Sequence, residues 1–246
     1  MAFKTYDFML ASAQGFKAGE SGENQKQHIC QATLGPEAAV WVNHPACISE
    51  NGNRRPNFWM GQATFPRVAQ WKDTLIAVHR LRENDRFDFT HAYFPTWAFD
   101  DYVIQANAAF ARKGDGYIAL RAAQGLTLVT RGKSAYRELC STGRQNVWLC
   151  QMGATDSDGD FAAFQRTVLA LPARLEAQAA HFTSLRGEKL SFGWKTPLLV
   201  DGRDQPIAGF KHCDNPYCVA EWPAEKLEIR QGREILTLTI GDKPAR

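Results

Sequence analysis

Alternation of apolar and polar residues runs through most of the chain and predicts strands. The clearest instance is residues 28–44, where two alternating runs flank Gly35-Pro36, a turn signal that predicts a β-hairpin. The even positions of both runs are small or apolar, so we assign them to one buried face. These positions are Cys30, Ala32, Leu34, Ala38, Val40 and Val42. A histidine closes this face at each end, His28 on the first run and His44 on the second.

The register of this hairpin decides whether the two histidines meet. A loop of residues 35–37 places His28 opposite His44, close enough for both rings to reach one ion or one substrate group. A slip of one residue would turn His44 to the other face. We expect the first register because it keeps the buried face apolar, whereas the slipped one pairs Cys30 with Trp41. The alternative is that both histidines are polar strand ends at the rim of a sheet.

The same alternation recurs along the chain, with one helical exception. Strands are predicted over residues 5–14, 74–81 and 87–93, and a second hairpin over 110–121. Acidic residues before an apolar stripe at 161–170 predict the one convincing helix. Those acidic residues also resemble the first half of a calcium loop, but Thr167 stands where the loop needs a bidentate glutamate.

A dozen or more short strands with one short helix predict an all-β fold, a large antiparallel β-sandwich. We expect a single domain over residues 1–246. Within it, residues 1–153 form the main sheets, 154–172 a loop and helix, and 173–246 a C-terminal strand meander. The chain has 246 residues, 44% of them hydrophobic, which is enough material for such a core.

The amino-acid composition limits the binding partners and the cellular location that we expect for this chain. Lys and Arg number 29 against 26 acidic residues, a balance that argues against nucleic acid as a partner. We find no long apolar stretch and no leader, so no membrane partner is expected. The expected location is cytoplasmic for the chain as given, or periplasmic or secreted if it is part of a longer protein. Six cysteines are too few for a disulfide scaffold, and Cys213 with Cys218 makes at most half of a zinc site.

His91 and Tyr93 are candidate catalytic residues. They lie two positions apart on the strand predicted over 87–93, so their side chains point to the same face. An imidazole and a phenol in that arrangement are a workable base and acid. The alternative is structural burial of this aromatic run.

Aromatic and basic side chains gather after the hairpin. Arg54 and Arg55 belong to the densest turn signal of the chain, and loops held by a rigid sheet commonly carry function. Trp59 and Arg67 follow, and an aromatic plane beside an arginine suits a sugar ring and its carboxylate. With Trp97 as a further stacking platform, these are the predicted substrate-binding residues. Core packing of Trp59 is the alternative.

Five sequence strings carry a family resemblance over most of the chain. They read YDFMLASAQ from residue 6, QHICQATLGP from 27, VNHP from 42, HAYFP from 91 and GDGYIAL from 114. In these strings the chain resembles the C-terminal β-sandwich of bacterial heparinase II/III-like polysaccharide lyases and their uncharacterised relatives. In that family an N-terminal α/α toroid carries much of the catalytic apparatus, and the sandwich closes the cleft with a histidine-bearing strand.

The resemblance also implies a metal site. Some members of the family hold a metal ion in the sandwich by a histidine and a carboxylate from neighbouring strands. His28 matches the strand histidine, and His44 falls where the ligand of the next strand would stand. The implied cofactor is one divalent ion, zinc or calcium. The chain departs from the family where the usual His-x-His-x-Asp pattern reads His28-Ile-Cys30-Gln-Ala32, and no toroid precedes the sandwich.

The implied chemistry is β-elimination on a uronic acid, which needs a base, an acid and a group that neutralises the carboxylate. The resemblance assigns His28 or His91 as base, Tyr93 as acid or base, and Arg54 or Arg55 near the carboxylate. The predicted function is therefore binding of an acidic, uronate-containing polysaccharide and contribution of one wall of an elimination site, with a partner domain or a homo-oligomer completing it. The alternatives are a non-catalytic carbohydrate-binding sandwich and a structural or assembly domain.

Overall fold

The structure of this chain, a computed structural model, describes residues 1–22, 28–50 and 55–240. The chain divides into two compact units, Met1–Gln205 and Pro206–Arg246, and each is described by itself. The sequence-based prediction placed all 246 residues in one domain. All strand ladders of the four sheets in the described residues are antiparallel, and the helices are short, so the predicted all-β antiparallel fold is confirmed.

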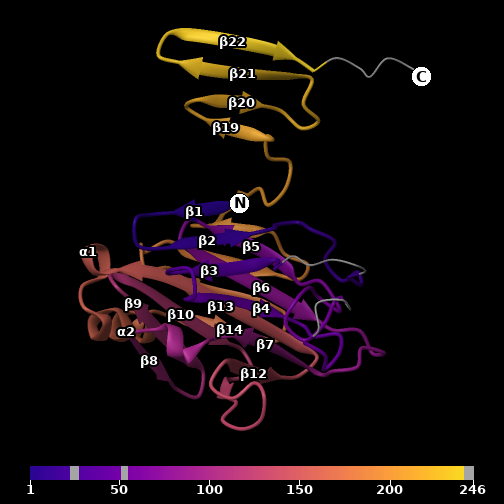
Figure 1. Cartoon of the computed structure of the whole chain (residues 1–246), viewed down its shortest axis with the longest axis vertical. Coiled ribbons are helices and arrows are strands. Elements are labelled where there is room, and N and C mark those ends of the chain that lie inside the picture. The colour runs from indigo at the N-terminus through magenta and orange to yellow at the C-terminus, as the bar shows by residue number, and fades with distance from the viewer. Residues whose placement is uncertain (23–27, 51–54, 241–246) are drawn as a thin grey trace. The chain divides into compact units, whose positions relative to one another are not determined.

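Two large sheets face each other in the first unit (Figure 1). The seven-stranded sheet has, in spatial order, β1 (Ala2–Lys4), β2 (Met9–Ser12), β3 (Cys30–Thr33), β4 (Ala39–Asn43), β7 (Phe89–Tyr93), β12 (Glu138–Thr142) and β11 (Thr127–Leu128). The six-stranded sheet has β5 (Arg67–Trp71), β6 (Thr74–Arg80), β13 (Gln145–Ala154), β10 (Gly116–Ala122), β9 (Ala108–Lys113) and β8 (Asp101–Ile104). Alternate apolar residues of both sheets share one core, among them Val42 and Ala92 from the first and Leu75 and Trp148 from the second.

A helix covers part of the outer face of the six-stranded sheet. A four-residue helix, α1 (Thr155–Asp158), precedes α2 (Phe161–Ala170), whose bounds are those predicted from sequence. The Asp160 carboxylate caps α2 by accepting from the main-chain nitrogen of Ala163 at 2.7 Å. The apolar stripe of α2 packs on residues of β9 and β10. The residues of this contact are Phe161, Phe164 and Val168 on the helix and Phe110, Tyr117 and Ala119 on the sheet.

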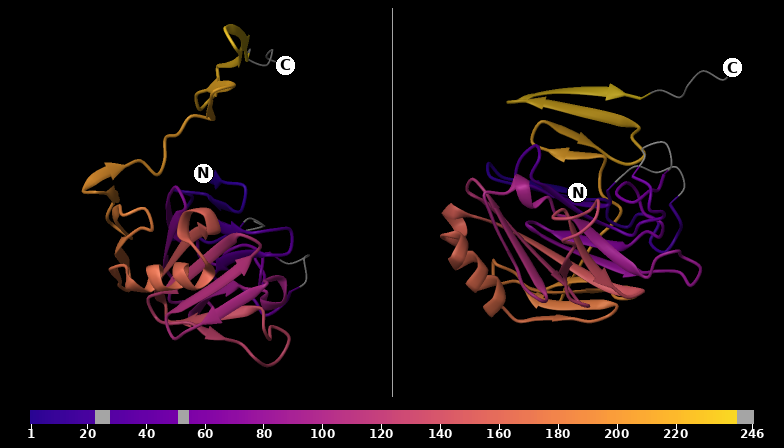
Figure 2. Two further views of the ribbon diagram at one scale, coloured as in Figure 1. Left: turned by 90° about the vertical axis from the view of Figure 1, so that its left-hand side faces the viewer. Right: turned by 60° about the horizontal axis from the view of Figure 1, so that its bottom comes forward.

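A five-stranded meander, orange in Figure 2, packs on the six-stranded sheet, where β15 contacts β13. Its strands are β14 (Ala173–Leu175), β15 (Ala179–Thr183), β16 (Lys189–Gly193), β17 (Leu198–Val200) and β18 (Arg203–Gln205). Polar contacts hold the meander to the turn between β5 and β6. Arg186 donates to the Asp73 carboxylate at 2.9 Å, and Lys72 donates to Glu188 at 2.8 Å. The first unit is therefore a sandwich with a third, partial layer.

The second unit is a small four-stranded meander of β19 (Cys213–Asn215), β20 (Cys218–Ala220), β21 (Lys226–Gln231) and β22 (Glu234–Thr239). Leu227 pairs with Leu238 and Ile229 with Leu236, so four apolar side chains share one face. The sequence predicted one strand meander over residues 173–246, and the strands of this stretch belong to two units that divide after Gln205.

The predicted strand over residues 5–14 is wrong at its beginning. Thr5 turns the chain instead: its hydroxyl accepts from the main-chain nitrogens of Asp7 and Phe8, each at 3.2 Å. This hydroxyl-centred turn separates β1 from β2 and leaves Tyr6 fully exposed. The apolar alternation there reflects a turn flanked by two short strands.

Candidate functional site

The β3–β4 hairpin has the register predicted from the sequence. Ala32 pairs with Val40, and the flanking pairs follow the same offset, so the alternative slipped register is excluded. Continued outward, this register would bring His28 opposite His44. However, β3 begins only at Cys30, so strand alternation no longer fixes the side to which the His28 ring turns.

The two histidines lie in different surroundings. The His28 ring stacks on Trp41, with centroids 4.2 Å apart, on the side of β4 away from the core. His44 is fully buried, its Nε2 lies 3.2 Å from the Phe87 carbonyl, and its Nδ1 lies 3.8 Å from the Asp85 carboxylate. In the part of the chain that the structure describes, no three His, Cys, Asp or Glu side chains are placed to hold a metal ion. An ion shared by His28 and His44 stays a prediction from the sequence.

Five ring side chains form a continuous series of contacts on the outer side of the seven-stranded sheet; we call them the aromatic face. They are His28, Trp41, Trp59, Tyr93 and Trp97. Trp41 and Tyr93 pair across β4 and β7, and their rings stack with centroids 4.2 Å apart. Trp59 and Trp97 meet Tyr93 edge to face, at 5.3 and 6.5 Å. The structure thus brings together four residues that the sequence singled out, His28, Trp59, Tyr93 and Trp97.

His91 lies beneath this series and is engaged on both ring nitrogens. Its Nδ1 lies 2.8 Å from the Glu138 carboxylate, and its Nε2 lies 2.9 Å from the Phe58 carbonyl. A carbonyl can only accept, so Nε2 carries a hydrogen. The Trp59 ring covers the imidazole at 4.6 Å, and His91 is fully buried. His91 therefore holds the Phe58–Trp59 segment over β7 and is not free to act as the predicted base.

Burial sets the protonation of the two remaining catalytic candidates. It lowers the pKa of His28 to about 4, so the imidazole is neutral near pH 7. It raises the pKa of Tyr93, against the opposing effect of Arg137, so the phenol keeps its proton. A neutral imidazole can accept a proton and a phenol can donate one. Each ring stacks on Trp41, however, and no hydrogen bond joins the two among the described residues.

The tryptophans of the aromatic face differ in access. Trp97 belongs to a short 3₁₀ turn, η1 (Thr96–Ala98), and is 59% exposed. It borders a cavity of about 320 Å³ that Lys113 and the tip of the β3–β4 hairpin also line. Trp59 is buried, and its Nε1 donates to Glu50 at 3.2 Å. Of the two predicted stacking platforms, Trp97 is thus the accessible one.

The predicted substrate-binding arginines differ in position and in contacts. Arg54 lies outside the described residues, and Arg55 is half-buried. Arg67 donates to the main-chain carbonyls of Gly193 and Thr196, the latter at 2.7 Å, and so ties β5 to the turn after β16. Arg67 is therefore a structural residue, not a group on the aromatic face.

Sequence reasoning missed a basic cavity lined by Arg80, Arg82, Arg144 and Trp194. It also missed His79, a fully buried histidine on β6. The alternation of β6 could have indicated that Arg80 shares a face with buried apolar residues. Nothing in the local pattern places Trp194 beside it, because that contact depends on how the sheets pack.

Comparisons with known proteins leave the family open. None of the protein families compared with this chain matches it, and the curated proteins and solved structures give no match either. No helix among the described residues is long and apolar enough to span a membrane. The likeness to heparinase II/III-like lyases stays a prediction from the sequence strings.

Proposed function

We propose that the Met1–Gln205 unit binds an acidic, uronate-containing oligosaccharide and that the aromatic face is its contact surface. The observation that carries the proposal is the accessible Trp97 at the end of a continuous series of rings, beside a cavity of about 320 Å³. An indole plane next to a concave, partly polar surface suits a sugar ring.

The acidic character of the ligand rests on the family resemblance and on two cations beside the rings. Lys113 lines the cavity at Trp97, and Arg137 lies over the Trp59 ring at 5.6 Å. Both cations also pair with a carboxylate, Lys113 with Asp100 and Arg137 with Glu50, each at 2.8 Å. They would have to share these partners with a ligand, so we expect modest affinity with strong salt dependence.

Binding is better supported than elimination by this unit alone. One candidate base, His91, has both nitrogens engaged, and the other, His28, is held in a stack with Trp41. β-Elimination also needs charge stabilisation at the uronate carboxylate in a site shielded from water. Trp97 is largely exposed to solvent, so a ligand stacked on it would not be shielded in this way. A carbohydrate-binding sandwich therefore fits these contacts more closely than a complete lyase site.

Titration of the full chain with uronate oligosaccharides tests the proposal. We expect saturable binding that Trp97→Ala abolishes, because its indole supplies the accessible stacking surface. Trp222→Ala is the matched control, since Trp222 is 72% exposed but belongs to the other unit. Failure to bind any uronate polymer, or binding that is equal in both variants, would overturn the proposal.

A second arm addresses turnover. Lyase activity produces an unsaturated sugar that absorbs in the ultraviolet, so incubation with the same polymers detects it directly. Product formation that disappears in both His28→Ala and Tyr93→Phe would show that these side chains contribute to an elimination site. Product formation that survives the double variant would remove them from any catalytic role.

A further inference from the structure

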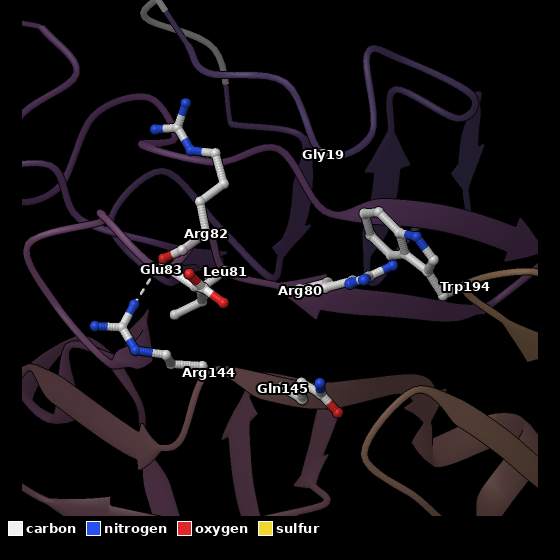
Figure 3. Close-up of a pocket in the computed structure, with 8 residues that line it drawn as sticks. All are labelled: Gly19, Arg80, Leu81, Arg82, Glu83, Arg144, Gln145 and Trp194. Carbon is white, nitrogen blue, oxygen red and sulfur yellow. Dashed lines mark hydrogen bonds between the residues drawn. The ribbon is translucent and has the colours of Figure 1, made fainter.

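A cavity of about 550 Å³ opens where β6 ends and β13 begins (Figure 3). Arg80 is the last residue of β6 and pairs directly with Gln145, the first residue of β13. Directly opposed residues leave a sheet on the same face, so the guanidinium and the carboxamide both border the cavity. Arg144 precedes Gln145, and Trp194 follows β16, so segments far apart in the sequence meet here.

The arginines of this cavity are not equally neutralised. Arg82 pairs with the buried Asp85 carboxylate at 2.7 Å. Arg144 donates to the main-chain carbonyls of Arg82 at 2.7 Å and Asp85 at 3.4 Å, so its donors are engaged within the protein. Arg80 makes no ion pair with any described residue, and Glu83, the acidic side chain among the described lining residues, is exposed. The cavity therefore presents an excess of positive charge to a ligand.

An aromatic side chain lies beside Arg80 on the cavity wall. The Trp194 indole packs over Gly19, where an added Cβ would lie 3.2 Å from the ring. A glycine with φ of +84° at that position lets the indole approach the chain closely. Figure 3 shows the Arg80 side chain extending toward this indole. The apolar Trp194 indole and the planar Arg80 guanidinium therefore border the same cavity.

From these contacts we infer a second binding site, which takes a single acidic sugar residue. The carboxylate pairs with Arg80, because a guanidinium offers two parallel N–H donors to a carboxylate. The sugar ring lies on Trp194, and Gln145 offers an amide to a hydroxyl group. A cavity of about 550 Å³ falls in the range of small-ligand sites. The site shares no residue with the aromatic face, so it does not depend on the function proposed there.

Titration of the full chain with glucuronate, followed by ligand-observed NMR, tests the inference. Glucose serves as the neutral analogue, and a glucuronate oligosaccharide distinguishes a free monosaccharide from the end of a chain. We expect glucuronate binding to weaken about tenfold in Arg80→Ala, since the variant loses a charge-assisted hydrogen bond to the carboxylate. Arg203→Ala is the matched control, because Arg203 is exposed on β18 and lies outside the cavity.

The outcomes separate this site from the aromatic face. Loss of glucuronate binding in Arg80→Ala with retention in Trp97→Ala supports the inference. Binding of the oligosaccharide alone, still lost in Arg80→Ala, also supports it and identifies a chain end as the ligand. The inference is overturned if neither glucuronate ligand binds, if glucose binds equally well, or if Arg80→Ala and Arg203→Ala bind like the unmodified chain.

Discussion

Replacement of His79 by leucine should remove a large part of the acid sensitivity of this fold. His79 lies on β6 with no exposed surface, and neither ring nitrogen has a hydrogen-bond partner among the described residues. Burial, reinforced by the nearby His44 and His91 rings, lowers the pKa of His79 from 6.5 to about 3. The folded chain therefore resists protonating a ring that the unfolded chain protonates readily.

The sign and the size of the pH effect on stability follow from the difference between the pKa of His79 in the folded chain and in the unfolded chain. Because the unfolded state binds the extra proton, the free energy of unfolding falls as the pH drops below 6.5, and the loss is complete near pH 3. For a single group with these two pKa values, the loss is about 2 kcal/mol at about pH 5 and about 3 kcal/mol at about pH 4. Near pH 7 the contribution of His79 is close to zero.

Urea unfolding at several pH values measures this directly. The free energy of unfolding of the unmodified chain should fall between about pH 7 and pH 5 by about 2 kcal/mol more than that of His79→Leu. His44 remains in the variant, so some acid sensitivity should persist. His181→Leu is the control, because His181 is exposed on β15. Equal pH dependence in the unmodified chain and His79→Leu would refute the assignment of this acid sensitivity to His79.

Three further outcomes are expected. Gly116→Ala should lower the free energy of unfolding by about 3 kcal/mol in urea titrations, because its Cβ would collide with the main-chain carbonyl of Asp7; an unchanged midpoint would contradict the close approach. Asp85→Asn should lower it by about 2 kcal/mol, since the buried carboxylate accepts from an arginine and a threonine; a loss below about 0.5 kcal/mol would argue against that network. Iodoacetamide should modify Cys218 in the folded chain and Cys150 only after unfolding, because burial raises the pKa of the Cys150 thiol; mass spectrometry reads both sites, and early modification of Cys150 would contradict its burial.

The elements predicted most accurately are those whose signals are local. The hairpin register followed from the apolar positions on either side of Gly35, and the helix from an acidic cap before an apolar stripe. The order of strands within the sheets could not be read in this way. β7 lies between β4 and β12, and β13 between β6 and β10, pairings that depend on packing between distant segments.

The site shows where a period-two pattern stops being informative. His28 lies two residues before β3, so its ring turns to Trp41 and away from the buried face that the pattern assigned to it. His91 and Tyr93 do share a face of β7, as alternation predicts. Burial, however, gives His91 a partner 47 residues away, Glu138, that no local pattern reveals. Face assignments were therefore sound within strands, whereas partners were not predictable.

The arginines of the first unit illustrate how structural and binding roles can be told apart in such a fold. Arg67 donates to two main-chain carbonyls and lies over the Phe192 ring at 4.6 Å, so its donors and its charge are already occupied by the protein. Arg186 likewise pairs with two carboxylates, those of Asp73 and Asp158. Arg80 has no such partner in the described structure, although it ends a strand whose other residues are buried. A cation without a partner at the wall of a cavity gains most from a ligand anion. Its removal should therefore weaken binding without destabilising the sheet, whereas removal of Arg67 should do the reverse.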